Sequence, residues 1–112
     1  MSGRRLNRRL VLEASQAVAD GAGGQGVIWV ALGTLWAEVT PGAGREGQGE
    51  EVILGLTACR IVVRGAPVGN PRRPLPGQRF AEGTRRFAIL AVAEADAAGR
   101  HLTCFCREEV PA

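Results

Sequence analysis

The stretch TACRIVVR, residues 57–64, is the clearest strand signal in the chain. Its side chains alternate with a period of two, which predicts an extended strand with one buried face. The inward set is Thr57, Cys59, Ile61 and Val63, and the outward set is Ala58, Arg60, Val62 and Arg64. Further strand signals recur along the chain.

Two further runs lie downstream. In residues 84–94 both faces are largely apolar, which predicts a central strand with Phe87, Ile89, Ala91 and Ala93 on one face. Residues 100–108 place Leu102, Cys104 and Cys106 on one face and predict the last strand.

Upstream, residues 10–12 are a short apolar run, and residues 14–26 are expected to be a loop. Residues 27–32 and 35–40 flank Gly33-Thr34 and predict a hairpin. In the second run, Trp36 lies on the face opposite Leu35 and Val39.

The remaining segments are rich in glycine, proline and arginine. Residues 1–8 are expected to be a mobile arm, residues 41–56 a glycine-rich loop, and residues 65–78 a loop with four of the six prolines. Residues 50–56 also allow one short helix. Together these segments predict an all-β fold, a small barrel of about six antiparallel strands with long Gly/Pro-rich loops, formed by residues 1–112 as one domain.

Composition narrows the class of protein. Leu, Ile, Val and Phe make up a quarter of the 112 residues, which suffices for one modest core. All 14 basic residues are arginine, and the net charge of +3 is weak evidence for nucleic-acid binding. Three cysteines and a start without an apolar signal segment favour reduced thiols and synthesis in the cytoplasm. No apolar run approaches the ~20 residues of a membrane span, so no membrane association is expected.

The sequence contains only weak matches to nucleotide-binding, metal-binding and catalytic motifs. Glycines at 21, 23 and 26 match the dinucleotide pattern but lack the preceding strand and following helix that would hold a pyrophosphate. Cys59, His101, Cys104 and Cys106 are a poor zinc set, because His101 would point away from Cys104 in a regular strand. No nucleophile–base arrangement is visible. We therefore expect no catalytic residue, no metal and no cofactor.

The arginine cluster Arg4, Arg5, Arg8 and Arg9 has two interpretations, a solvated terminal arm or a docking segment for an acidic partner surface. A small barrel with arginine loops could also bind nucleic acid through the phosphate backbone. The five aromatic residues fit a core or an interface better than a base-stacking platform.

A series of short motifs runs along nearly the whole chain in a familiar order. They are LNRRLVLE at 6–13, DGAGG at 20–24, WVA at 29–31, LWAEVTP at 35–41, GRE at 44–46, IVVR at 61–64, PGQRF at 76–80, FAILAV at 87–92 and LTC at 102–104. In this order and spacing the chain resembles the phage head–tail joining family, also called head-closure or stopper proteins. It is particularly similar to the versions in gene transfer agents of alphaproteobacteria.

The resemblance implies a β-barrel that assembles with copies of itself as a ring in the particle neck. The ring would lie between the portal or adaptor protein and the tail terminator or tail tube, and packaged DNA would pass through it without sequence recognition. The loop at 41–56 would project into the channel, with Gly44, Arg45, Glu46, Gly47, Gly49, Glu50 and Glu51 as its candidate gating residues. Its glycines suit a mobile gate, and its carboxylates would repel the DNA backbone.

Candidate contacts with a neighbouring subunit or partner are Arg4, Arg5, Arg8, Arg9, Trp36, Arg72 and Arg73. Trp36 could equally be a second-layer core residue. Two alternative functions stay open, a nucleic-acid-binding small barrel and a neighbouring connector component such as a tail terminator.

Overall fold

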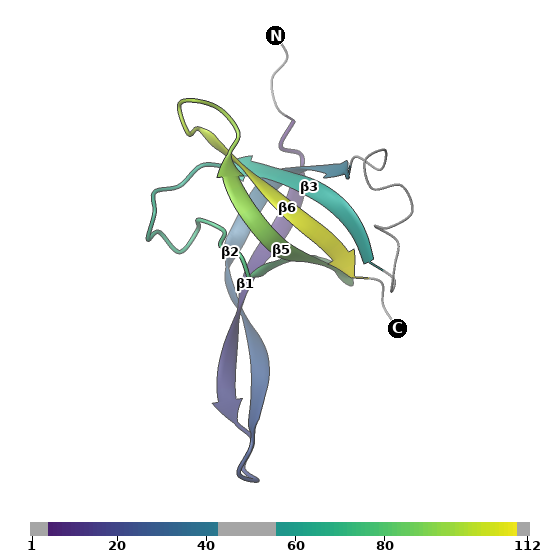
Figure 1. Ribbon diagram of the computed structural model, residues 1–112, viewed down its shortest axis with the longest axis vertical. Helices are drawn as coiled ribbons and strands as arrows, with labels where there is room; N and C mark the ends of the chain where they lie inside the picture. The colour runs from purple at the N-terminus through teal and green to yellow at the C-terminus, as the bar shows by residue number, and fades with distance from the viewer. Residues whose placement is uncertain (1–4, 43–55, 110–112) are drawn as a thin grey trace.

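The computed structural model describes residues 5–42 and 56–109, which form six antiparallel strands and, within those ranges, no helix (Figure 1). The strands are β1 (Arg8–Ala19), β2 (Gln25–Pro41), β3 (Leu56–Arg64), β4 (Arg79–Glu82), β5 (Arg85–Glu94) and β6 (His101–Glu109). They close into a barrel in the order β1-β2-β3-β6-β5-β4. The all-β prediction with six strands is confirmed. The short helix expected within 50–56 lies outside the described residues, apart from Leu56, which begins β3.

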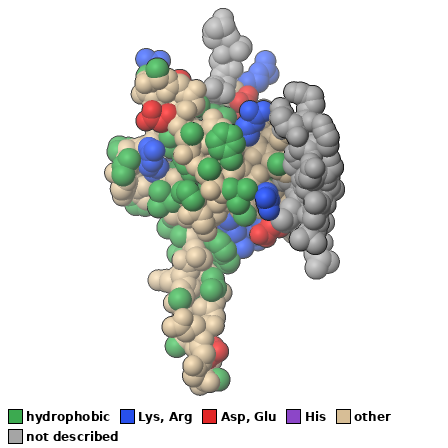
Figure 2. All heavy atoms as spheres, in the orientation of Figure 1, with side chains coloured by type: hydrophobic (Ala, Val, Ile, Leu, Met, Phe, Trp, Pro, Cys, Tyr) green, Lys and Arg blue, Asp and Glu red, His purple; other side chains and the backbone are tan. Residues whose placement is uncertain are grey.

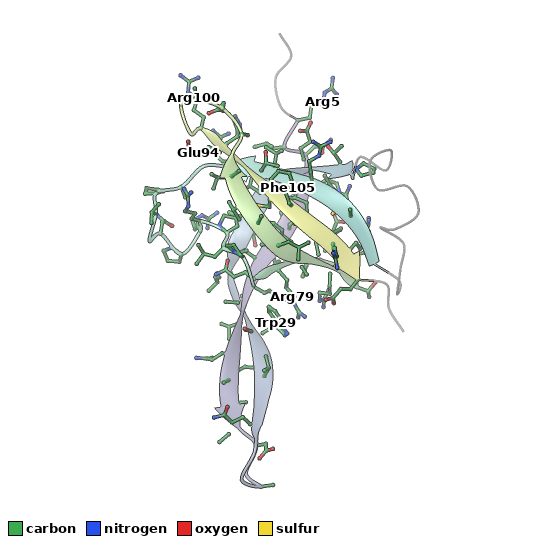
Figure 3. The ribbon with its side chains drawn as sticks, viewed as in Figure 1. Arg5, Trp29, Arg79, Glu94, Arg100 and Phe105 are labelled. Carbon is green, nitrogen blue, oxygen red and sulfur yellow. The ribbon has the colours of Figure 1, made fainter. Side chains whose placement is uncertain are left out.

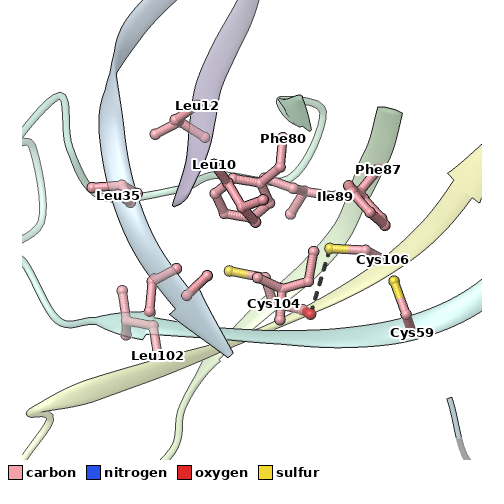
Figure 4. Close-up of a cluster of buried hydrophobic side chains, with 13 residues drawn as sticks. Leu10, Leu12, Leu35, Cys59, Phe80, Phe87, Ile89, Leu102, Cys104 and Cys106 are labelled. Atoms are coloured by element: carbon pink, nitrogen blue, oxygen red, sulfur yellow. Dashed lines mark hydrogen bonds between the residues drawn. The ribbon is translucent and has the colours of Figure 1, made fainter. Parts of the chain in front are cut away.

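The core fills the barrel with one face of every strand (Figure 4). Its largest side chains include Phe80, Phe87, Leu10, Leu12, Ile61, Ile89 and Leu102. The predicted inward positions in β3 and β6 are confirmed, since the side chains of Cys59, Ile61, Val63, Leu102, Cys104 and Cys106 are all buried. The prediction that Val62 is exposed is wrong. Val62 lies between Glu38 of β2 and Thr103 of β6 and is only 5% exposed, so the outward face of β3 is covered at this position, which alternation alone does not reveal.

A bulge at Leu90 changes the faces of β5. The pairing with β6 steps from Ile89↔Cys106 to Ala91↔Phe105, so Leu90 is the extra residue. Beyond it Val92 packs against the core, whereas Ala91 and Ala93 are exposed. The sequence prediction that Ala91 and Ala93 share the face of Phe87 is therefore wrong, because strict alternation cannot anticipate an inserted residue.

The hairpin predicted at Gly33-Thr34 and the loop predicted for residues 14–26 are also wrong. β2 runs without a break from Gln25 to Pro41, and β1 continues to Ala19. The turn lies at residues 20–24, where the backbone N–H groups of Ala22 and Gly24 donate to Asp20 Oδ1 over 2.8 and 3.0 Å. Gly21 and Gly23 supply positive φ angles of 82° and 87° there, a conformation that other residues rarely adopt.

β1 and β2 extend well beyond the barrel. At Leu32 the register steps from Leu12↔Gly33 to Glu13↔Ala31, and past this bulge the two strands pair only with each other, apart from Glu13, which also faces β4. Residues 13–31, called the arm below, project from the barrel as a twisted two-stranded ribbon at the lower end of Figure 1. The molecule therefore measures 56 × 35 × 22 Å rather than being near-spherical.

Phe87 and Leu90 of β5 differ sharply in burial, so we expect their truncation to alanine to affect stability differently. Phe87 is fully buried, whereas Leu90 at the bulge is 50% exposed. Phe87→Ala is expected to lower the free energy of unfolding by about 3–5 kcal/mol, through lost burial and the cavity left behind. Leu90→Ala is the control and should change it by less than about 0.5 kcal/mol. Urea unfolding followed by circular dichroism measures both, and equal effects would contradict the observed core.

Candidate functional site

The arm exposes apolar side chains on both of its faces. Residues directly opposite each other in an antiparallel pair share a face. Ala14, Gln16 and Val18 therefore lie on one face with Val30, Ile28 and Gly26, and Ser15 and Ala17 lie on the other with Trp29 and Val27. Val27 is 62% exposed and Ile28 45% exposed. Figure 2 shows scattered hydrophobic side chains along the lower projection, with little charge among them. A two-stranded ribbon has no core in which to bury either face.

The base of the arm is fixed by Arg79 of β4. Its Nε donates to Glu13 Oε1 over 2.6 Å, and its guanidinium group lies 4.0 Å from the centroid of the Trp29 ring (Figure 3). The Arg79 and Glu13 side chains are only 20% and 17% exposed. A stacked and ion-paired arginine at this point holds the arm in one direction relative to the barrel. The sequence analysis did not identify this group.

A second surface lies where the N-terminal segment and the loop at 65–78 approach β2. A hollow of about 800 Å³ opens there between Leu6, Trp36 and Pro67, with Arg64 and Arg72 in its lining. Trp36 is 54% exposed and is not part of the core. The Arg9 guanidinium lies 5.9 Å from the centroid of the Trp36 ring, at the limit of a cation–π contact. The residues that line this opening, which also include Asn70, are referred to below as the hollow.

The two candidate arginines of the 65–78 loop make contacts within the chain. Arg72 Nη2 donates to the Thr34 carbonyl over 2.7 Å, and Arg73 Nη1 donates to the Ala66 carbonyl over 2.8 Å. A Cβ atom at Gly33 would lie 3.0 Å from Arg72 Nη1, so the glycine leaves room for this side chain. Arg72 thus fixes the loop against β2 at the edge of the hollow.

The arginines of the N-terminal cluster lie in different surroundings. Arg8 was expected to end a mobile N-terminal segment at residues 1–8. It instead begins β1 and forms a bidentate ion pair with Glu82 over 2.8 and 2.6 Å. Arg5 is exposed, and Arg4 lies outside the described residues. Of this cluster, Arg5 and Arg9 are the members that the described structure leaves exposed to a partner.

The Arg8–Glu82 pair belongs to a network at one end of the barrel. Arg85 pairs with Glu108 over 2.6 and 2.9 Å and lies 3.7 Å from Glu82. The hydrogen bonds from Arg8 and Arg85 hold the pKa of Glu82 and the pKa of Glu108 below their ordinary values. The network joins β1, β4, β5 and β6, which are the strands on either side of the barrel closure.

The candidate gating residues all lie outside the described residues, namely Gly44, Arg45, Glu46, Gly47, Gly49, Glu50 and Glu51.

The cysteines, the histidine and the carboxylates of the described ranges are the candidates for a metal site. Within residues 5–42 and 56–109 there is no group of three or more His, Cys, Asp and Glu side chains that could hold a metal. Cys59, Cys104 and Cys106 are buried free thiols, and burial raises the pKa of Cys104 to about 12. His101 Nδ1 lies 3.2 Å from Asp96 Oδ2 in the β5–β6 turn. The same ranges contain no helix that could span a membrane.

The ion-pair network predicts a specific pH dependence. The pKa of each glutamate is lower in the folded than in the unfolded chain, so the stabilisation is complete above pH ~5 and is lost as pH falls through the lowered values. Glu82→Gln with Glu108→Gln should lower the free energy of unfolding at pH 7 by about 0.2–1 kcal/mol per pair. The deficit should shrink as pH falls through the lowered pKa values of the two glutamates, because protonation removes the charge that each pair needs. Urea titrations over a series of decreasing pH values measure it, and a deficit of constant size across the series would contradict the electrostatic origin.

Comparisons with known proteins give two kinds of match. A family described as phage head completion protein matches residues 1–109. A chain in the structure "Virion of native gene transfer agent (GTA) particle" is 57% identical, with a TM-score of 0.76, over 98% of this chain and 100% of that chain. A protein of Shigella flexneri 2a with a known solution structure is 25% identical, with a TM-score of 0.68 over 96% of both chains. A search of curated proteins found no significant match.

Proposed function

Because this chain belongs to the phage head completion protein family, we propose that it is a structural component of a phage-like particle that closes the DNA-filled head. In this role it forms a ring with copies of itself between the portal or adaptor protein and the tail. The ring retains the packaged DNA and offers the surface on which the tail docks. No catalysis is required for such a role.

The observation that carries this proposal is the match to the gene transfer agent particle. The 57% identity extends over the full length of a chain that belongs to an assembled virion, rather than over one motif. A shared barrel alone would support only a shared fold, because small barrels serve many functions.

The surface of the described residues supports an assembly role as well. The arm and the hollow expose apolar side chains, whereas one end of the barrel is covered by ion pairs. Exposed apolar surface of this kind usually marks a protein–protein contact. The role of residues 41–56 as a channel loop stays a prediction from the sequence, in which Glu46, Glu50 and Glu51 give the channel a negative lining.

The alternative of a nucleic-acid-binding barrel is disfavoured by the use of the arginines. Arg8, Arg79 and Arg85 pair with glutamates, and Arg72 and Arg73 bind backbone carbonyls. Side chains held in this way are less available to phosphates. The alternative of a tail terminator shares the same architecture and is distinguished by position in the particle.

The proposed function predicts the phenotype of particles made without this protein. Electron microscopy is expected to show DNA-depleted heads separated from otherwise normal tails, and DNase treatment should degrade DNA that wild-type particles protect. Supplying the wild-type chain should restore tailed, DNA-filled particles.

Two other outcomes argue against the proposal in different ways. Tailed particles that retain DNA would reject a connector role. Closed, DNA-filled heads with tails of abnormal length would instead favour the tail terminator.

A further inference from the structure

We propose that the arm of one copy packs into the hollow of the next copy, and that this contact builds the ring. The inference rests on the proposed function, because it names the surfaces through which the ring forms. It concerns only described residues, namely 13–31 on one copy and the lining of the hollow on the other.

The arm requires an external cover. Val27, Ile28, Trp29 and Val30 follow one another in β2 and are 37–62% exposed, so apolar side chains point to both faces of the ribbon. The only described covering is Arg79, which lies over Trp29 at the base. The arm strands also have free backbone edges without Pro, Lys or Arg, the residues that usually protect such edges.

The hollow cannot be filled by the arm of its own chain. β2 runs continuously from Gln25 in the arm to Trp36 and beyond, and the Glu13–Arg79 ion pair holds the base of the arm. A continuous strand does not fold back onto itself. The arm therefore points away from the hollow of the same molecule and is presented to a neighbour.

The two surfaces are complementary in chemistry. Residues 14–31 carry a single charge, that of Asp20 at the tip, and are otherwise apolar or neutral. The hollow offers Trp36, Leu6 and Pro67 as apolar walls and carries Arg64 and Arg72. An apolar ribbon with one negative tip thus meets an apolar hollow with positive groups. DNA is a poor occupant for the arm, since residues 10–44 contain no basic side chain.

The geometry also suits a ring. Two different surfaces on one chain give a head-to-tail contact, which generates a closed ring when the rotation between copies closes. The seven residues of each arm strand, at about 3.3 Å per residue, reach roughly 20 Å beyond the barrel. That reach is comparable to the molecule's shortest dimension of 22 Å, so the arm can extend across the face of a neighbour.

The first test disrupts the arm without touching the core. Ile28→Glu with Val30→Glu places two carboxylates on one exposed face of the arm. Burying them against a neighbour is costly, so incorporation into particles should fall at least about tenfold. The control is Leu90→Glu, an equally exposed apolar site on β5, which should incorporate normally. Matching circular dichroism and thermal unfolding of the purified variants show that the fold is retained.

The second test identifies the occupant. In particles carrying Ile28→Cys with Asn70→Cys, mild oxidation should link arm to hollow and give a ladder of covalent multimers of this chain. The native cysteines are buried and contribute little. Each single variant is the control and should give no ladder.

The outcomes separate this inference from the proposed function. If the wild-type chain is absent from particles, the proposed function fails. If the wild-type chain is present but Ile28→Glu with Val30→Glu incorporates as well as wild type, the arm–hollow contact alone is overturned. Cross-links from the arm only to a different particle protein also overturn it.

Discussion

The barrel depends on three residue pairs between β1 and β4. Val11, Leu12 and Glu13 lie opposite Ala81, Phe80 and Arg79, and this short ladder is the only one that closes the ring of six strands within the described residues. Leu12 and Phe80 face inward and are fully buried, so the closure also completes the core. The next pair, Glu13 with Arg79, faces out of the barrel, and its ion pair lies at the base of the arm.

The arm follows from that closure. Because β4 has only four residues, β1 loses its second neighbour at Glu13, while β2 gains an extra residue at Leu32. From there the two strands have each other alone and twist away from the barrel. The charged pair at the boundary, stacked on Trp29, separates a part of β1 that is stabilised by the core from a part that has no core of its own.

Sequence reasoning predicted the barrel strands well, because β3 and β6 alternate regularly and their inward residues are buried as expected. It did not predict the arm, because it assigned residues 14–26 to a loop. Residues 27–32 were interpreted as the first strand of a hairpin whose turn lies at Gly33-Thr34. In the structure Gly33 is extended and gives space to Arg72. Bulges at Leu32 and Leu90 add residues that a period of two cannot reveal.

The residues of the candidate site were also predicted only in part from the sequence. Trp36 was identified because its side chain lies on the strand face opposite to that of Leu35, and it is exposed in the lining of the hollow. Arg8 and Arg72 were chosen for their charge, yet both stabilise the subunit itself, because an arginine close to a carboxylate or a carbonyl binds it before any partner arrives. Partners of arginine depend on tertiary contacts between distant segments, which no local pattern contains. For assembly, uncharged apolar surface is therefore the more informative signal in this chain, and it is concentrated on the arm and beside Trp36.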